Sequence, residues 1–394
     1  PSLQEGKVPN FQKTQTEMAD ANRLPSRRIV PALKPGKVPG TVDIELKVSD
    51  SLPLHASAEL NNDHGPNTAA LRTVATVHYD DLWELGHSIS GTALIAPERP
   101  GDSKVFAGSY LAPIWGSPWS MLLYGYTSNS DVTAIGGLGV LGKGYAVGVR
   151  AIRQLPQWGN YSQSLNFGID FKHFKQDLSL GGAGVTAAVD YWPLSASYSL
   201  QGEDNGSQVN INLAATLGLR GIGSGVATFN NNRAFASPDF IHVNLDTDLL
   251  YNLGSDIFAD VRFSGQLSDG PLLSGEQFAA GGLQSVRGYL QSEAVGDDGV
   301  FGSLELRSPS IAPYLFNFVD EWRFYGFADN AAVWLHKPLA GQQDTFTLLS
   351  AGGGTRFSLF NHFTADALIG VPLRSGTVRK ANHPYAAFRV KTEF

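Results

Sequence analysis

Apolar and polar residues alternate along much of the chain with the period of a β-strand. The alternation is clearest in residues 165–172, 257–264, 363–371 and 388–394. A period of two predicts strands that have one apolar and one polar face. The segments are about 9–12 residues long, which suits a tilted strand that crosses a membrane and is roughly twice the usual length in a soluble sheet. The pattern therefore predicts an all-β protein whose strands span a bilayer.

The connections between these segments alternate in length. Long ones such as Asn61–Thr68, Asp177–Thr186 and Asp269–Gly299 are separated by short turns such as Trp83–Gly86 and Leu253–Ser255. Long loops at one end and short turns at the other are typical of membrane barrels, so we predict a transmembrane antiparallel β-barrel of about 16 strands over residues 52–394. The alternative is a large soluble sandwich or propeller, but no repeat of about 40–50 residues is visible.

The first fifty residues have a different pattern. Residues Thr14–Arg23 are predicted to form a short polar helix that ends before Pro25, and strands are predicted at Arg27–Leu33 and Thr41–Val48. The second strand alternates strictly, which predicts that it is half buried. Residues 1–50 are therefore expected to form part of a small α/β module. The chain begins with Pro1 and shows no signal sequence, so we expect it to start after a processed signal or within a longer protein.

Composition and charge narrow the possible functions. The chain has no cysteine, which excludes disulfides, thiolate metal sites and cysteine nucleophiles. A net charge of −7 provides no basic surface for nucleic acid. The nine histidines show no metal-binding spacing, and no nucleophile-elbow sequence is present. We therefore expect no enzymatic activity, no cofactor and no metal ion.

Charged residues inside the predicted strands provide a physical test of the barrel. An arginine or lysine that faces lipid at mid-membrane costs about 2–4 kcal/mol. The basic residues in these strands all fall on the phase opposite the apolar side chains, and carboxylates share that phase. They are expected to face a wet interior: Lys172, Arg262, Arg307, Arg323 and Arg389, with Asp170, Asp246, Asp248, Asp260, Glu305 and Asp329.

The most informative segment is Gly281–Tyr289, with the sequence GGLQSVRGY, inside the long connection at residues 269–299. A loop of this length usually signals function or disorder. An arginine flanked by glycines on such a loop can fold back into the barrel and pair with a carboxylate on the wall. A glycine turn followed by a strand would not explain the arginine.

At this point the sequence resembles a known family, the outer-membrane transporters of two-partner secretion, of the filamentous-haemagglutinin transporter and haemolysin-activator type, within the BamA-like superfamily. The VRGY sequence is typical of the superfamily, and the stretch PGTVD…LPLH…NN is typical of the secretion branch. Further matching segments are SLELRSP (303–309), FADNAAVW (327–334) and the terminal aromatic residue. The resemblance implies that residues 1–50 are the C-terminal part of a periplasmic POTRA domain. The family's plug helix, linker and first POTRA domain are not recognisable in this sequence.

The resemblance also implies roles for individual residues. Arg287 would pair with Asp329, and Phe327 belongs to the same F-x-D motif, in which Ala331 replaces the usual glycine. Glu305 would lie beside them on the barrel wall. Phe394 would end the signal for outer-membrane insertion. The loop motif that enters the lumen would comprise Gly281, Gly282, Ser285, Val286, Arg287, Gly288 and Tyr289.

The resemblance implies a function as a pore that carries an unfolded exoprotein from the periplasm to the cell surface of a Gram-negative bacterium. The expected partners are this exoprotein, bound through the POTRA part and the lumen, outer-membrane lipid, and the barrel assembly machinery during biogenesis. No nucleic acid is expected. The alternatives are a BamA-like assembly factor that inserts other barrels and a passive diffusion porin; an adhesin would need larger extracellular loops.

Overall fold

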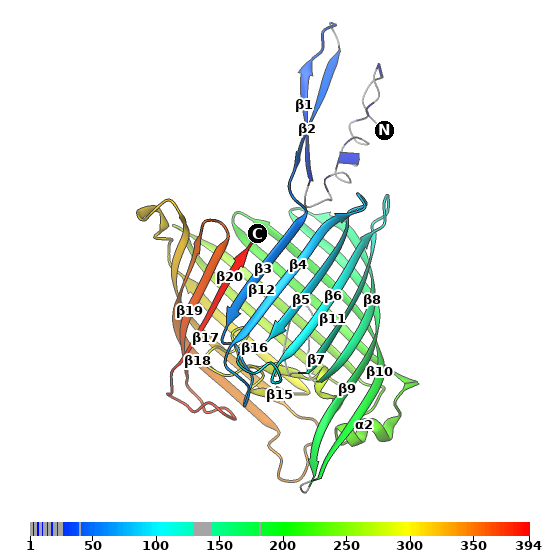
Figure 1. The fold of residues 1–394 in the computed structure, drawn as a ribbon, viewed down its shortest axis with the longest axis vertical. Coiled ribbons are helices and arrows are strands. Elements are labelled where there is room, and N and C mark those ends of the chain that lie inside the picture. The colour runs from blue at the N-terminus through cyan, green and yellow to red at the C-terminus, as the bar shows by residue number, and fades with distance from the viewer. Residues whose placement is uncertain are drawn as a thin grey trace.

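The computed structural model describes residues 27–38, 41–129, 143–180 and 183–394, together with isolated positions among the first 26 residues. Sixteen antiparallel strands form a closed barrel (Figure 1). The predicted fold class and strand number are therefore confirmed. The barrel strands are β3 (Leu54–Asn61), β4 (Arg72–Leu82), β5 (His87–Ile95), β6 (Lys104–Pro113), β7 (Trp119–Asn129), β8 (Lys143–Trp158), β9 (Tyr161–Leu180), β10 (Ala183–Asp204), β11 (Ser207–Gly223), β12 (Ile241–Gly254), β13 (Ile257–Ser268), β16 (Asp298–Arg307), β17 (Val319–Trp334), β18 (Thr345–Leu359), β19 (Phe363–Pro372) and β20 (Tyr385–Glu393).

Each barrel strand pairs with its neighbour in the sequence, and β20 pairs with β3 to close the cylinder. This seam contains five residue pairs, from Arg389 with Asn61 to Glu393 with Ser57, which is fewer than between any other neighbouring strands of the described barrel. Closure joins the first and last strands of the described barrel, so most backbone polar groups along the wall are satisfied without water.

The two faces of the wall follow the sequence pattern. On β13, Val261 and Phe263 are exposed on the outside, whereas Asp260, Arg262 and Gln266 point inward. Among the described residues, no helix is long and apolar enough to cross a membrane. Charged residues that are predicted to face inward have partners on the inner face of the wall. Arg307, for example, pairs with both Asp260 and Glu305. The lumen is thus charged in both signs, as the strand phases predict.

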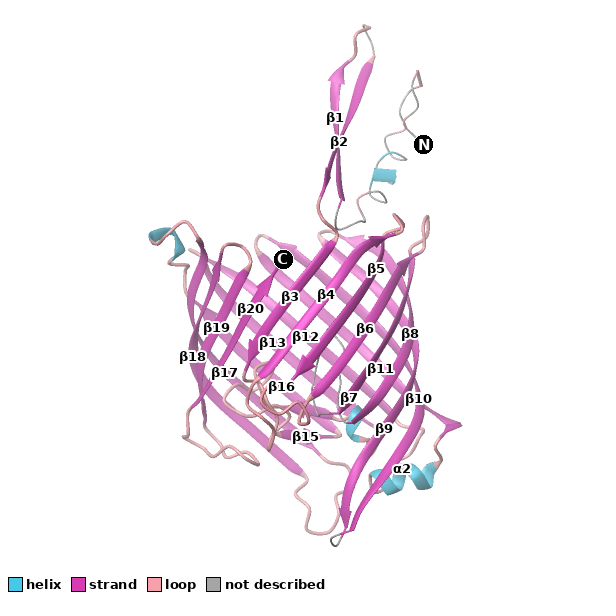
Figure 2. Ribbon diagram, viewed as in Figure 1, coloured by secondary structure: helices cyan, strands magenta, loops and turns pink. Residues whose placement is uncertain are grey.

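One predicted loop is wrong. Residues Asp177–Thr186 were expected to connect two strands, but β9 continues to Leu180 and β10 begins at Ala183. The glycine-rich sequence suggests a loop, yet backbone pairing requires no side-chain pattern and the two strands continue as a long hairpin. A short helix, α2 (Val226–Asn232), follows β11 near this hairpin (Figure 2).

Before the barrel, β1 (Arg27–Pro35) and β2 (Val42–Asp50) form a two-stranded antiparallel hairpin. Both strands agree with the sequence within two residues. The predicted half-burial of the second strand is wrong in the described structure, because Val42, Leu46 and Val48 are exposed. Most of the predicted helix at Thr14–Arg23 lies outside the described residues, so the assignment of residues 1–50 to a partial POTRA domain stays a prediction.

Buried apolar residues lie inside the barrel rather than between layers. The connection between β13 and β16 fills part of the lumen and contains η1 (Ser274–Glu276) and a small sheet of β14 (Phe278–Ala280) and β15 (Ala294–Gly296). Its side chains pack with those of β16–β18 in one cluster: Phe278, Ala280, Val286, Tyr289, Ala294, Phe301, Ala331, Val333 and Leu348. Another short helix, η2 (Ala312–Tyr314), lies in the turn before β17.

Candidate functional site

The loop between β13 and β16, residues 269–297, is folded into the barrel at the end opposite the β1–β2 hairpin (Figure 2). We call Val286–Tyr289 the tip and Ser274–Glu276 the stem of this loop. Each makes a separate set of polar contacts with the wall.

At the tip, the Arg287 guanidinium donates two hydrogen bonds to Asp329 on β17. The Nε–Oδ2 distance is 2.8 Å and the Nη2–Oδ1 distance is 2.9 Å. The Arg287 backbone N–H also donates to Asp329 Oδ2, at 3.0 Å. Ser303 on β16 accepts a hydrogen bond from Arg287 and donates one to Asp329. A planar fork that matches a carboxylate in this way fixes orientation as well as distance.

A second carboxylate and an aromatic ring complete the tip. Glu305 on β16 accepts a hydrogen bond from Arg287 Nη1, and the Phe327 ring centroid lies 3.7 Å from the guanidinium carbon. Arg287, Asp329 and Glu305 are only 4 %, 1 % and 2 % exposed. Burial lowers the pKa of Arg287, but the hydrogen bonds and charges of Asp329 and Glu305 outweigh it and leave this pKa above its ordinary value. The arginine is therefore a permanent cation.

Glycines allow the tip to approach the wall closely. Gly288 has a φ of +97° and lies directly against Gly370 on β19. A Cβ at Gly370 would lie 2.7 Å from the Gly288 nitrogen, a distance that real Cβ atoms do not adopt. Gly281 also has a positive φ, and its N–H donates to Ser285 Oγ at 2.8 Å, which closes a turn before the tip. The site therefore requires a glycine at Gly370 as well as at Gly288. The sequence analysis predicts Gly288 but misses Gly370.

The residues on either side of the arginine are fixed by packing. Val286 and Tyr289 are buried in the cluster with Ala331. The Tyr289 hydroxyl lies 2.9 Å from the Leu349 carbonyl and 2.7 Å from the Arg374 carbonyl, which are the two acceptors for its single proton, and it accepts a hydrogen bond from the Leu349 N–H. Ala331 occupies the place of the expected glycine, and its methyl group is part of the packed interior. The departure from the family's pattern therefore leaves the tip intact.

At the stem, the charges are reversed, because the loop supplies the anion. Glu276 accepts hydrogen bonds from Lys172 Nζ on β9, at 2.6 Å, and from the Tyr191 hydroxyl on β10, at 2.7 Å. His242 Nε2 on β12 lies 3.2 Å from its other oxygen. Burial raises the pKa of Glu276, but Lys172 and His242 outweigh it and hold the pKa at about 2.

Two further carboxylates hold the loop where it returns to the wall. Asp297 is fully buried and accepts hydrogen bonds from the backbone of Leu272 and His336 and from the Arg233 side chain. Glu293 accepts from the backbone N–H groups of Val378 and Arg379, in the connection before β20. The loop is thus attached to several parts of the barrel and does not hang freely in the lumen.

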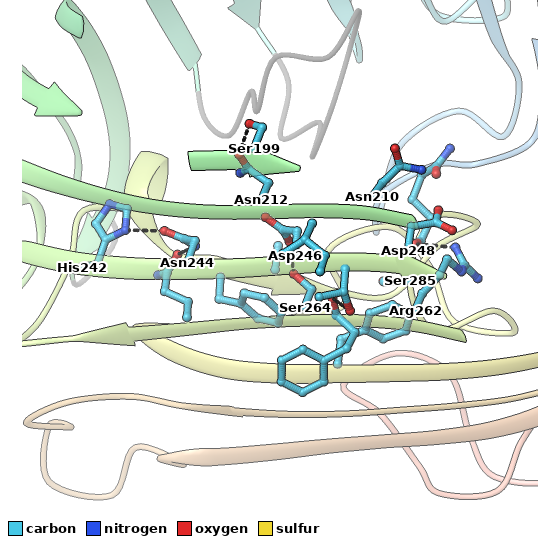
Figure 3. Close-up of a pocket in the computed structure, with 18 of the residues that line it drawn as sticks. Ser199, Asn210, Asn212, His242, Asn244, Asp246, Asp248, Arg262, Ser264 and Ser285 are labelled. Atoms are coloured by element: carbon cyan, nitrogen blue, oxygen red, sulfur yellow. Dashed lines mark hydrogen bonds between the residues drawn. The ribbon is translucent and has the colours of Figure 1, made fainter. Parts of the chain in front are cut away.

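The loop leaves a polar cavity of about 870 Å³ beside it. Figure 3 shows residues of β10–β13 and the loop that point into this space, and the labelled ones are all polar. They hydrogen-bond one another along the wall: Ser199 donates to Asn212 at 3.0 Å, and Asn244 donates to Gln266 at 2.6 Å. The lumen therefore has one wall covered by the tip of the loop, on β16–β19. The other wall, on β10–β13, is covered only where the stem contacts Tyr191 and His242 and is otherwise open to the cavity.

The structure brings most of the sequence-predicted site residues together. Arg287, Asp329, Glu305 and Phe327 are in direct contact, and Gly282 approaches Asp63 after β3. Phe394 lies away from this site: its backbone pairs with Ala56 on β3, and its ring is exposed and stacks on His362. The sequence analysis misses the contact between the stem and the wall. No motif marks Glu276, and Lys172 is predicted only to face the interior, without a partner.

Comparison with known proteins agrees with this geometry. The profile of the haemolysin secretion/activation protein family ShlB/FhaC/HecB matches residues 40–357. The chain belongs to this family. The family comprises outer-membrane transporters of two-partner secretion, so this member is a protein-secreting pore of the outer membrane and not an enzyme. No curated protein sequence matches the chain.

Solved structures show the same fold at low sequence identity. CdiB from Escherichia coli has a TM-score of 0.71 at 18 % identity, over 99 % of this chain and 72 % of that one. CdiB from Acinetobacter baumannii has 0.68 at 15 %, over 100 % and 70 %. BamA from Haemophilus ducreyi lacking POTRA domains 1–3 has 0.65 at 16 %, over 100 % and 80 %. At these identities the likeness to BamA concerns the fold alone.

Proposed function

We propose that this two-partner secretion transporter passes an unfolded exoprotein through its lumen along the open polar wall, while the tip of the loop stays on the opposite wall. The observation that carries the proposal is the cavity between the loop and β10–β13. Side chains such as Asn212, Asn244 and Ser264 can exchange hydrogen bonds with an extended backbone. Most of the residues that line the cavity are polar, and Phe278 and Phe301 add apolar surface on its loop side.

The loop contacts support a positioning role for Val286–Tyr289. Two carboxylates, a backbone contact and an aromatic ring hold Arg287 in one position. A residue that only packed against the wall would not need these directional contacts. We propose that this attachment sets the width and shape of the conduit, and that the cargo passes beside the tip.

The absence of cysteine from the chain allows a direct test of the route. Asn212 and Leu213 are neighbours on β11, but Asn212 lines the cavity and Leu213 is exposed on the outside. Asn212→Cys should form crosslinks to a stalled exoprotein, and the matched Leu213→Cys should form none. Crosslinks at neither position during active secretion would exclude the lumen route. Crosslinks of an inserting barrel strand at Leu60→Cys, which pairs with Val390 in the seam, would indicate the assembly-factor alternative instead.

We also propose that the β1–β2 hairpin lies in the periplasm, as part of the POTRA domain within residues 1–50, and binds the exoprotein there. Both strands pair only with each other in the described structure, so each has an outer edge to which an extended segment can add as a further strand. On β1 such a segment would have to displace the Asn22 side chain, which hydrogen-bonds the backbone of Ile29. Proline substitutions along one edge should weaken exoprotein binding while leaving the barrel folded. Unchanged binding for both edges would contradict strand addition.

The terminal residue is proposed to act during biogenesis, through recognition by the barrel assembly machinery. The Phe394 side chain is 69 % exposed and supports little of the folded barrel. Phe394→Ala should therefore lower the amount of protein in the outer membrane but leave the thermal stability of the inserted fraction unchanged. Normal insertion would contradict this role.

A further inference from the structure

Two histidines face each other on the inner wall near the β1–β2 hairpin. His55 on β3 and His78 on β4 occupy directly paired positions, and their ring centroids are 4.6 Å apart with an interplanar angle of 16°. Asp80 follows two residues after His78 on the same face, and its Oδ2 lies 3.6 Å from His78 Nε2. One ligand atom from each of the three side chains lies within 4.8 Å of the others.

The ligand atoms of these histidines are available. In the described part of the chain, neither imidazole makes a protein hydrogen bond, and the contact between His78 and Asp80 is longer than a hydrogen bond. All three residues are partly exposed, so an ion can reach them from the mouth of the barrel. By contrast, His87 on β5 already contacts the Tyr110 hydroxyl at 2.5 Å.

The combination of donors selects a class of ion. Two imidazole nitrogens and one carboxylate oxygen match the ligands of zinc sites with three protein ligands and an open fourth position. Calcium and magnesium prefer oxygen ligands throughout. We propose that His55, His78 and Asp80 bind a Zn²⁺ ion on the inner wall of the barrel at its hairpin end. The ligand atoms lie within 4.8 Å of one another, and the two stacked rings have to rotate out of their parallel arrangement for their in-plane lone pairs to meet on one ion.

The position of this site gives the ion a structural consequence. β3 is the strand that closes the barrel by pairing with β20, and this seam has five residue pairs. Glu393 on β20 pairs with Ser57, two residues after His55. A zinc ion that joins β3 to β4 would stiffen the first strand, which forms one side of the seam.

The test uses the purified full-length transporter in detergent, without exoprotein, so its outcome is independent of the secretion route. The protein is dialysed against micromolar zinc and its metal content is measured. We expect one zinc per chain, and tetrahedral absorption bands when cobalt replaces zinc. His55→Ala, His78→Ala and Asp80→Asn should each lower the affinity at least about 10–100-fold, the loss that even an outer-shell change produces. His87→Ala is the matched control and should bind as the parent does.

A second readout guards against misfolding of the variants. Each variant is first shown to be folded by its heat-dependent migration on gels, and His55→Gln is used if His55→Ala is not folded. Zinc should raise the melting temperature of the parent and of His87→Ala but not of the three ligand variants. No bound zinc in the parent, or equal binding by the folded ligand variants, would overturn the proposal.

Discussion

The tip and the stem of the lumen loop are attached to the barrel with opposite polarity. At the tip the loop supplies the cation, Arg287, and the wall supplies Asp329 and Glu305. At the stem the loop supplies the anion, Glu276, and the wall supplies Lys172. A loop inserted in the reverse sense would place like charges together, so the pattern specifies one orientation as well as holding the loop in place.

The two attachments also differ in geometry. Arg287 makes a bidentate contact, stacks on Phe327 and uses its own backbone N–H, whereas Lys172 is a point charge on a flexible stem. The tip should therefore be intolerant of conservative changes, and the stem more tolerant. The predictions below test this difference, from the largest expected effect to the smallest.

Arg287→Ala should have the largest effect. It leaves the buried Asp329 without its cation, while Glu305 keeps its contact with Arg307, and the loss of one member of a buried ion pair costs about 3–5 kcal/mol. The sixteen strands keep their backbone pairing, so the barrel should remain folded while secretion falls strongly. Exoprotein in the culture medium and heat-dependent gel migration measure the two effects. Arg287→Lys should rescue little, because a lysine cannot form the fork; full secretion by either variant would contradict the positioning role.

Glu276→Gln should have a smaller effect. The amide keeps the shape of the stem but loses the charge that Lys172 faces, and hydrogen bonds to charged groups contribute about 1.5–3 kcal/mol. We expect secretion to be reduced less than in Arg287→Ala, with a higher conductance in planar bilayers because the stem is less firmly held. A secretion defect as large as that of Arg287→Ala would show that the two attachments act as one unit.

Acid should release the stem. The pKa of Glu276 is held at about 2, below its ordinary value of 4.5. Its contribution is therefore complete above about pH 4.5 and is lost as the pH falls toward 2. Parent channels should keep a steady conductance between pH 7 and 4.5 and conduct more at lower pH, relative to Glu276→Gln channels recorded under the same conditions. Identical pH profiles for the two proteins would exclude Glu276 as the titrating group.

The sequence was sufficient for the barrel because lipid and water impose a strict requirement on its wall. Every strand must present apolar residues outward, so a period of two is visible in residues such as Val261 and Phe263 without any knowledge of their neighbours. The contact between Arg287 and Asp329 could also be predicted, but only through the family resemblance. Period and spacing alone indicate a cation in a loop and not its partner.

The remaining contacts could not be read from the sequence. Lys172 and Glu276 are 104 residues apart, and they meet only because the loop crosses the lumen to β9. His55 and His78 have no metal-motif spacing; strand pairing alone brings them together. The extended hairpin of β9 and β10 was missed because its glycine-rich tip resembles a loop. In each case the deciding information is the register or the loop path, which local patterns do not contain.

The smallest effect on stability is expected on the open wall, with Asp246→Asn. This carboxylate accepts a hydrogen bond from Ser264 and lines the cavity without pairing with the loop. Its neutralisation should change the free energy of unfolding by no more than about 0.5 kcal/mol, which is usual for solvated positions. It should nevertheless reduce the cation preference of the pore, measured as the reversal potential in a salt gradient, because a charge in a narrow conduit acts on each passing ion. Glu276→Gln serves as the comparison, since its carboxylate is buried at the stem. If Asp246→Asn destabilised the barrel more than Glu276→Gln, the division into a covered wall and an open wall would be wrong.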